Sequence, residues 1–395
     1  MEFKQETFLK NSEILLMIEL LKWQQGNVIN KRSKLYTSIG ENSIDFNRFI
    51  SLVESHRVQN HIYLAANELN IFPKDILCKF EAVKSASDKF ALKQAYELKK
   101  ISDLCHKNNI KFTVLKGLPL SKSLYGDISI RASRDIDILV QDKDLYKVIK
   151  AFEKSYLALT PINNKLEDIK RYCPHIEYKS RATGILVEVH WKLFNYDFQG
   201  PSFFDFAKKN LIYEELLGAR FYTYNFKCNF LYCLIHGSKH RWSRLLWLCD
   251  IAAFSNKSEF DIDEIIALAQ TFKVTRLVLN SFYLSRVILG IPQKLEIKKM
   301  TASNIKYVRT ALRLINSNTI SVRKDGFIER SKDKITQLKS DFSLQKGFKY
   351  KSNVLVKNFI TVYDIDIIKL PKRIIFLYIF LHPILAFVRW HKSKK

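Results

Sequence analysis

Two aspartates separated by one residue, Asp135 and Asp137, are the residues whose types and spacing most directly indicate chemistry. They stand at the start of an apolar segment, Ile136–Val140, that is short enough to be a buried β-strand. On a strand, residues two apart point to the same face, so both carboxylates should project together while Ile136 and Ile138 enter the core. Paired carboxylates repel each other and are costly to bury without a cation. Hard oxygen ligands suit Mg²⁺, so the pair is a candidate metal site.

A lysine–glycine pair precedes the aspartates. The apolar segment Phe112–Leu115 predicts another buried strand, and Lys116 and Gly117 follow it directly. Glycine lets the backbone come close to a phosphate, and the N–H groups at the start of a helix favour anions. We expect such a helix over Pro119–Tyr125, followed by a basic loop. The cationic residues of this stretch are Lys116, Arg131 and Arg134.

A third carboxylate, Glu188, lies further along the chain. The segments His175–Lys179 and Ile185–Trp191 predict two strands joined by a hairpin loop that contains Gly184. Period-two alternation puts Glu188 and His190 on one face of the second strand. An acidic residue in such an apolar strand is costly unless it meets a cation. Glu188 is therefore either a metal ligand or an edge-strand residue that faces solvent.

The order of these elements resembles that of the nucleotidyltransferase superfamily with the polymerase-β-type fold: a strand, Lys-Gly, a helix, a basic loop and the Asp-Ile-Asp strand. The closer resemblance is to an uncharacterised bacterial nucleotidyltransferase family whose motif runs LKG, then L and Y, then R, then DIDLLV. It extends from the helix near Leu92 to about Pro292. Leu118 follows the glycine, where the wider superfamily has Gly or Ser. Glu188 stands where members of the closer family commonly have Asp.

The resemblance implies an enzyme that transfers an NMP from an NTP such as ATP to a hydroxyl acceptor and releases pyrophosphate. It implies that Mg²⁺, or Mn²⁺, is held by the catalytic carboxylates Asp135, Asp137 and Glu188. It also implies that the triphosphate lies near the residues Lys116, Gly117, Arg131 and Arg134. The acceptor is open between RNA, a lipid-linked or surface-glycan precursor and a small molecule.

A second signature of that family, a His followed by W-x-R-L-x-W-L-x-D, resembles the segment that begins at His236. His236, His240, Arg244 and Trp247 have the spacing of one helical stripe. We expect His240 and Arg244 to bind nucleotide phosphates and Trp247 to form a wall of the cleft. Two alternatives remain: the histidine pair could bind zinc, or Trp242, Trp247 and Asp250 could simply hold the helical domain against the sheet.

The chain of 395 residues is long enough for two or three units, and its 47% hydrophobic content is typical of a globular protein. The expected fold class is α+β, with a small mixed β-sheet nucleotidyltransferase core flanked by N-terminal and C-terminal helical regions. The predicted parts are an N-terminal helical region over 1–108, the α/β core over 109–204, a helical domain bordering the cleft over 205–295, and a basic region with an apolar terminal helix over 296–395.

The charge is strongly positive. The net charge is +26, and residues 296–395 hold 22 Lys and Arg against 7 Asp and Glu. Such a block favours a polyanionic partner, RNA or an anionic membrane, although it could also be a solvated surface. The apolar segment Ile374–Val388 is short for a membrane span and is interrupted by Pro383, so it predicts either an interfacial anchor or a core helix. A second Asp-x-Asp, Asp364 and Asp366, lacks the lysine–glycine turn and is not expected to bind metal.

Cysteine usage indicates the compartment. The six cysteines show neither a CxxC pair nor zinc-like spacing, so we expect reduced thiols and no disulfide-linked partner. The first ten residues have no apolar signal core, which favours a cytoplasmic protein, peripheral on the inner face of the membrane if the terminal helix binds lipid. The alternative function is a catalytically inactive nucleotidyltransferase-fold protein that binds RNA or an anionic membrane surface.

Overall fold

The structure is a computed structural model that describes residues 11–26, 44–161, 166–193, 201–291, 302–317, 327–345 and 347–392. The chain divides into two compact units, each built from three separate stretches. Unit 1 comprises Met1–Leu92, Gly117–Ser133 and Phe226–Arg323. Unit 2 comprises Lys93–Lys116, Arg134–Asn225 and Lys324–Lys395.

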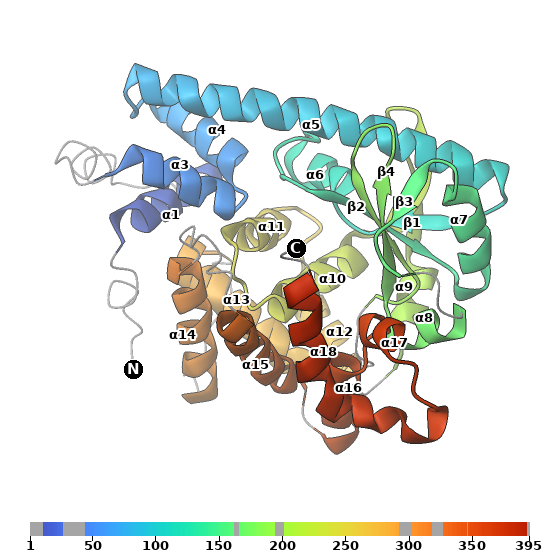
Figure 1. Cartoon of the computed structure of the whole chain (residues 1–395). Helices are drawn as coiled ribbons and strands as arrows, with labels where there is room; N and C mark the ends of the chain where they lie inside the picture. Colours follow the sequence, from blue (N-terminus) through green and yellow to red (C-terminus); the bar gives the residue numbers. More distant parts are fainter. Residues whose placement is uncertain are drawn as a thin grey trace. The chain divides into compact units, whose positions relative to one another are not determined.

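Unit 2 contains a seven-stranded sheet with the order β3-β4-β5-β2-β1-β7-β6 (Figure 1). Two neighbouring pairs are parallel, β2·β5 and β1·β7, and the other pairs are antiparallel. The sheet is therefore mixed, and the predicted α+β class is confirmed. The strands are β1 (Phe112–Val114), β2 (Asp135–Val140), β3 (Tyr156–Ala158), β4 (His175–Ser180), β5 (Leu186–His190), β6 (Leu211–Leu216) and β7 (Ala219–Tyr224).

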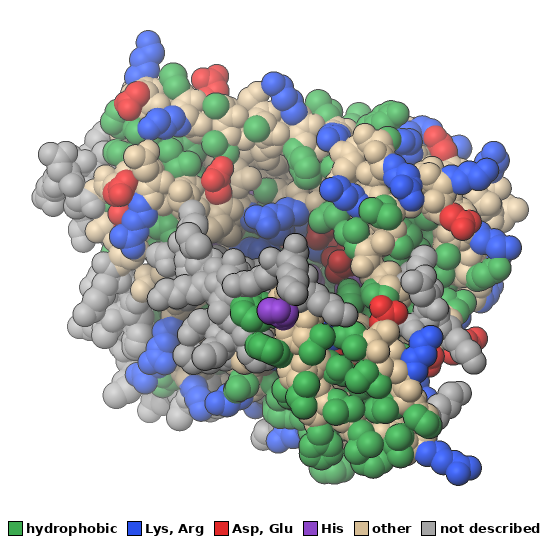
Figure 2. Space-filling view, in the orientation of Figure 1, with side chains coloured by type: hydrophobic (Ala, Val, Ile, Leu, Met, Phe, Trp, Pro, Cys, Tyr) green, Lys and Arg blue, Asp and Glu red, His purple; other side chains and the backbone are tan. Residues whose placement is uncertain are grey.

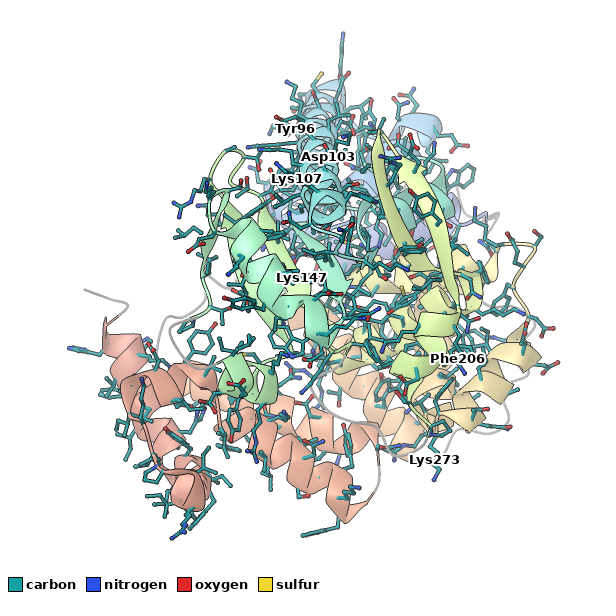
Figure 3. All side chains as sticks on the ribbon, turned by 90° about the vertical axis from the view of Figure 1, so that its right-hand side faces the viewer. Tyr96, Asp103, Lys107, Lys147, Phe206 and Lys273 are labelled. Carbon is teal, nitrogen blue, oxygen red and sulfur yellow. The ribbon has the colours of Figure 1, made fainter. Side chains whose placement is uncertain are left out.

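Helices cover the apolar face of this sheet. The second half of the long helix α5 (Lys74–Lys107) belongs to unit 2, as does α7 (Leu145–Phe152). One side of α5 joins the core of the sheet through Leu98, Ile101 and Cys105. The exposed side of the same helix carries Tyr96, Asp103 and Lys107 (Figure 3). Apolar residues at helical spacing thus fix the face with which α5 packs.

The sequence predicted a helical domain over 205–295, but the structure shows that this region is not helical throughout. Residues 211–224 form the hairpin β6–β7, which extends the sheet next to β1. Leu217 and Gly218 connect the strands with φ of 48° and 78°, the left-handed pair that a two-residue hairpin turn requires. The other elements described in or bordering this region are helices: α9 (Phe203–Lys209), α10 (Phe226–Lys239), α11 (Leu245–Ser255), α12 (Ile262–Thr271) and α13 (Thr275–Leu289).

Unit 1 is helical in its described residues. In its core, the ring of Phe230 packs against those of Phe254 and Phe282, at centroid distances of 4.8 and 5.8 Å. Asn11 and Asp45 cap the first turns of two helices with their side-chain oxygens. Besides α10 to α13 and the first part of α5, the unit contains α1 (Ser12–Gln24), α3 (Phe46–Ser55), α4 (Gln59–Leu69), α6 (Leu118–Tyr125) and α14 (Ala302–Ser317).

The last part of unit 2 is also helical. It contains α15 (Phe327–Leu344), α16 (Phe348–Phe359), α17 (Val362–Ile367), the 3₁₀ segment η3 (Lys372–Leu377) and α18 (Tyr378–Lys392), while α8 (Leu166–Tyr172) precedes β4. Asp364 of the second Asp-x-Asp is fully buried and pairs with His382 and Arg389 of α18. This aspartate therefore holds two helices together.

Pro383 does not break the terminal helix, contrary to the prediction. The helix α18 continues through it. A proline removes one intrahelical hydrogen bond, and contacts on both sides of the residue can offset that loss. Tyr378 and Leu385 are buried on either side of Pro383, and His382 lies 2.7 Å from the carboxylate of Asp364.

Candidate active site

The sheet brings the three predicted carboxylates together. Asp137 and Glu188 are register partners in the parallel pair β2·β5, and Asp135 precedes them on the same face. One carboxylate oxygen from each of the three residues lies within 4.8 Å of the others. Because β5 lies between β4 and β2, Glu188 is on a central strand and not on an edge. The cluster could hold a metal ion.

Apolar alternation explains why the carboxylates face this way. The opposite face of the two strands enters the core, where it buries Ile136 and Ile138 of β2 and Val187 and Val189 of β5. A slip of one residue would expose these four side chains and bury the acids, so the core fixes the register. Only 3% of the surface of Asp137 is exposed.

Lys116 neutralises part of this charge. Its Nζ lies 2.9 Å from Asp137 Oδ2 and 3.7 Å from Asp135 Oδ1. Burial lowers the pKa of Lys116, but the carboxylates of Asp137 and Asp135 outweigh burial and raise the pKa above its usual value. In turn, burial acts to raise the pKa of Asp137, yet the Lys116 ammonium and a hydrogen bond from His190 hold it well below its usual range.

His190 is a site residue to which the sequence analysis gave no role. Its Nε2 lies 3.2 Å from Asp137 Oδ1 and 3.1 Å from Glu188 Oε2. Burial acts to lower the pKa of His190, but its hydrogen bonds to the two carboxylates raise it overall. The position of His190 two residues after Glu188 already put both side chains on one face. What the sequence could not show was that Asp137 lies on the adjacent strand.

The donor set fits a hard divalent cation. The cluster keeps an excess negative charge, because three carboxylates face at most two cationic side chains, Lys116 and His190. Oxygen ligands with excess negative charge are what Mg²⁺ and Mn²⁺ prefer. A bound ion of this kind would be held by Asp135, Asp137 and Glu188.

The remaining residues predicted around the triphosphate lie in different surroundings. Gly117 precedes α6 with a φ of 77°, a conformation that favours glycine. Arg134 is exposed and directly precedes β2. Arg131 is buried in unit 1, where its Nε donates at 3.0 Å to both carboxylate oxygens of Asp250. This ion pair gives Arg131 a structural partner, and its role in nucleotide binding stays a prediction.

The expected single helical stripe from His236 to Trp247 is wrong. The helix α10 ends at Lys239 and α11 begins at Leu245. Between them, Arg241 and Trp242 have φ of 57° and 53°, which interrupts a right-handed helix. The buried ring of Trp242 is packed against Gly237 in this turn.

The side chains of that stripe nevertheless meet within unit 1. The rings of His240 and Trp247 stack with centroids 5.0 Å apart, and those of His236 and His240 are 4.6 Å apart. The Arg244 guanidinium lies 5.4 Å from the Trp247 ring centroid. Among the described residues, the groups of donors suited to a metal ion do not include this histidine pair. Nucleotide binding by His240 and Arg244 stays a prediction.

A comparison with protein families matches residues 42–290, more than half of the chain, to a family described as "Uncharacterised nucleotidyltransferase". The chain belongs to this family. The matched range of this nucleotidyltransferase-family protein contains every residue of the carboxylate cluster. Among curated proteins, no sequence matches the chain.

Among solved structures, the chain resembles an antigenic nucleotidyltransferase-like protein from Paracoccidioides brasiliensis. The two are 11% identical, and the match covers 47% of this chain and 91% of that chain, with a TM-score of 0.29.

Proposed function

We propose that this protein is a metal-dependent nucleotidyltransferase that moves an NMP from an NTP, ATP among them, to a hydroxyl acceptor and releases pyrophosphate. The observation that carries the proposal is the cluster of Asp135, Asp137 and Glu188, whose oxygens lie within 4.8 Å of one another on one face of the sheet. Such a cluster, next to a half-buried lysine, suits a reaction that handles the negative charge of a triphosphate.

Each side chain of the cluster has a task in this proposal. Asp135, Asp137 and Glu188 would hold Mg²⁺, or Mn²⁺, which supplies electrostatic stabilisation of the phosphate oxygens when it is bound. Lys116 lies beside the acids and would neutralise charge on the leaving pyrophosphate. His190 donates its Nε2–H toward Asp137 and Glu188 and so orients both carboxylates. Gly117, the next residue after Lys116, would let the backbone approach a phosphate.

Nucleotide binding tests this proposal against a non-catalytic scaffold. Purified protein should bind labelled NTP only in the presence of Mg²⁺, and Asp135→Ala should abolish that binding, because the substitution removes a proposed ligand. Asp103→Ala, on the exposed side of α5, is the control. RNA or lipid binding that weakens with salt and is unchanged in Asp135→Ala, together with no NTP binding, would favour the scaffold.

A second observation supports a location at a membrane surface. The stretch Arg373–His391 is 19 residues long, and by length and composition it is apolar enough to cross a membrane. Only 11% of it is buried inside the protein, so most of this apolar stretch is not part of a core. Phe376, Phe380 and Ile384 are 53%, 71% and 62% exposed. Figure 2 shows hydrophobic side chains gathered over η3 and α18, in the lower part of the view.

We infer that this face docks a cytoplasmic enzyme peripherally on an anionic membrane. The basic C-terminal hundred residues would attract the lipid, and the exposed rings would insert shallowly. A membrane-linked acceptor would then be within reach, while RNA or a small molecule remain the other acceptors. Co-sedimentation with phosphatidylglycerol vesicles at low salt tests the inference. Phe380→Gln with Ile384→Gln should release the protein, whereas the exposed Tyr146→Gln on α7 should not.

A further inference from the structure

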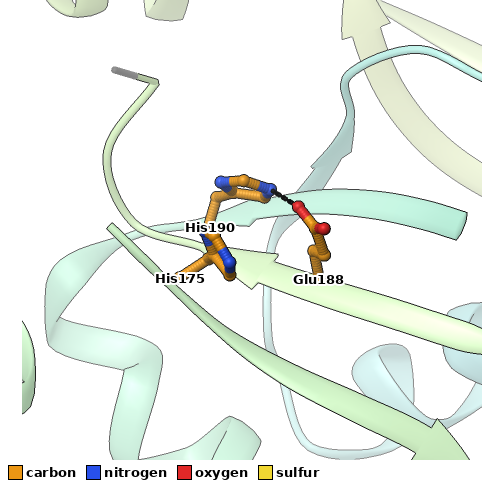
Figure 4. Close-up of side chains that lie close together, drawn as sticks. All are labelled: His175, Glu188 and His190. Carbon is orange, nitrogen blue, oxygen red and sulfur yellow. Dashed lines mark hydrogen bonds and ion pairs between the residues drawn. The ribbon is translucent and has the colours of Figure 1, made fainter. Parts of the chain in front are cut away.

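A second group of donor side chains lies on β4 and β5, beside the carboxylate cluster. His175 and His190 are register partners in this antiparallel pair, and Glu188 lies two residues before His190. One ligand atom from each of His175, Glu188 and His190 lies within 4.8 Å of the others. Figure 4 shows the two imidazoles and the carboxylate gathered together over the pair of strands.

The chemistry of this group differs from that of the aspartates. Two imidazole nitrogens and one carboxylate are the donors that Zn²⁺ and other borderline divalent ions prefer, whereas Mg²⁺ prefers oxygen alone. Zinc sites with three protein ligands of this kind keep a further position open. The donor set therefore indicates an ion of another class than the one expected at Asp135 and Asp137.

The geometry is close to what such an ion requires. Ligand atoms on one zinc ion are roughly 3.4 Å apart, since each metal–ligand bond is about 2.1 Å. His190 Nε2 and Glu188 Oε2 are already 3.1 Å apart. The imidazole centroids of His175 and His190 are 4.8 Å apart, so small side-chain rotations would bring the third ligand into place. The folded sheet thus already holds the ligands close together, so that little further conformational entropy is lost when an ion binds.

His175 also has the surroundings of a metal ligand. Its Nε2 lies 3.5 Å from the Glu177 carboxylate, and its Nδ1 is buried with no hydrogen-bond partner among the described residues. A buried nitrogen without a partner is unfavourable until it meets a donor or an ion. A carboxylate on the other nitrogen of a ligating histidine fixes the ring and strengthens the ligand. Glu177 is placed to do this.

We propose that His175, Glu188 and His190 form a second cation site, selective for Zn²⁺ or a similar borderline transition-metal ion. Glu188 belongs both to this site and to the carboxylate cluster. The Nε2 proton of His190 passes to solvent when the ion binds, because a ligating imidazole is neutral. The proposal concerns ion binding alone and does not depend on nucleotidyl transfer.

Co²⁺ is the probe that tests this site, because its visible absorption reports nitrogen ligands and it takes zinc geometries. Full-length protein freed of metal with a chelator should bind one Co²⁺ that Zn²⁺ displaces. His175→Ala should weaken binding by at least about 10-fold, and Glu177→Gln by about 10-fold. Asp135→Asn should change it by less than about threefold, because Asp135 belongs only to the oxygen cluster. His391→Ala, an exposed histidine, is the control.

Two results would overturn the proposal. Equal Co²⁺ affinity in His175→Ala and the unmodified protein would show that the ion binds elsewhere. Binding lost in Asp135→Asn but kept in His175→Ala would assign the ion to the carboxylates. Thermal unfolding in the presence of chelator shows whether each variant is folded, and His175→Gln, which keeps a polar side chain of similar size, replaces His175→Ala if the latter does not fold.

Discussion

Glu188 lies directly beside Asp137 in the sheet, because the two residues are register partners across the parallel strands β2 and β5. His190 Nε2 lies within 3.2 Å of both carboxylates. Two acidic residues from segments far apart in the sequence thus share one histidine. The arrangement explains how Glu188 completes a cluster that the Asp-x-Asp motif only begins.

Whether the site requires the length and the charge of the Glu188 side chain can therefore be tested. Glu188→Asp keeps the charge and matches the residue common in the resembled family, so we expect metal-dependent transfer to fall by no more than about 10-fold, or about 1.4 kcal/mol. Glu188→Gln keeps the size but removes the charge, and we expect a loss of about 100-fold. Steady-state rates at saturating Mg²⁺ measure both. Equal activity of Glu188→Gln and the unmodified protein would show that the Glu188 carboxylate takes no part in the reaction.

A packing contact in unit 1 gives a second prediction. A Cβ on Gly237 would lie 2.4 Å from the ring of the fully buried Trp242. Alanine normally favours a helix over glycine by about 0.5–1 kcal/mol, but overpacking costs about 1–3 kcal/mol. A contact below 3.0 Å puts the overpacking cost at the upper end of that range, so after the helix preference is subtracted we expect Gly237→Ala to lower the free energy of unfolding in urea by about 2 kcal/mol. Trp242→Leu, which removes the clashing ring atoms, should make the same alanine nearly neutral. A Gly237→Ala protein that is more stable than the unmodified protein would contradict the close packing of Trp242 against Gly237.

Two buried histidines of unit 1 predict sensitivity to acid. Burial lowers the pKa of His56 to about 4, and burial together with Arg131 lowers the pKa of His61 to about 3. Both would titrate near 6.5 in the unfolded chain. Between pH 6.5 and 4 the unfolded state therefore binds more protons, so stability falls as the pH falls.

Replacing His61 should reduce that sensitivity. Its ring packs edge-on against Tyr125, and both ring nitrogens are buried without a hydrogen-bond partner among the described residues. His61→Phe keeps the packing and removes the titration, so the fall in unfolding free energy between pH 7 and 5 should be smaller than in the unmodified protein. His391→Ala, which is exposed, is the control. An unchanged pH dependence in His61→Phe would contradict the burial argument.

Period-two alternation was enough to predict the faces of Asp135, Asp137 and Glu188, because apolar residues between them can only enter a core. The strand β1, the lysine–glycine turn, the helix α6 and the strand β2 followed from local sequence as well. His190 was placed on the correct face without a role, since its partner Asp137 lies 53 residues earlier in the chain, and only strand pairing brings them together.

Other features depended on contacts that no local pattern reveals. The hairpin β6–β7 was missed because its turn, Leu217 and Gly218, lies within a segment that reads as part of a helical region. The break between α10 and α11 was missed because the spacing from His236 to Trp247 suits a helix, whereas Trp242 is buried against Gly237. Pro383 stays inside α18 because the neighbouring side chains are held by unit 2.

The central claim is that the carboxylate cluster transfers nucleotides, and the most direct measurement follows the label of an NTP. Purified protein, Mg²⁺ and cell extract are incubated with each NTP labelled at the α-phosphate, and transfer to an acceptor is measured for the unmodified protein and for Asp137→Asn, a variant that keeps the shape but removes a charge. We expect label on an acceptor, none from γ-labelled NTP, and at least a ~100-fold lower rate in a folded Asp137→Asn protein. Near-normal transfer by Asp137→Asn would contradict the account.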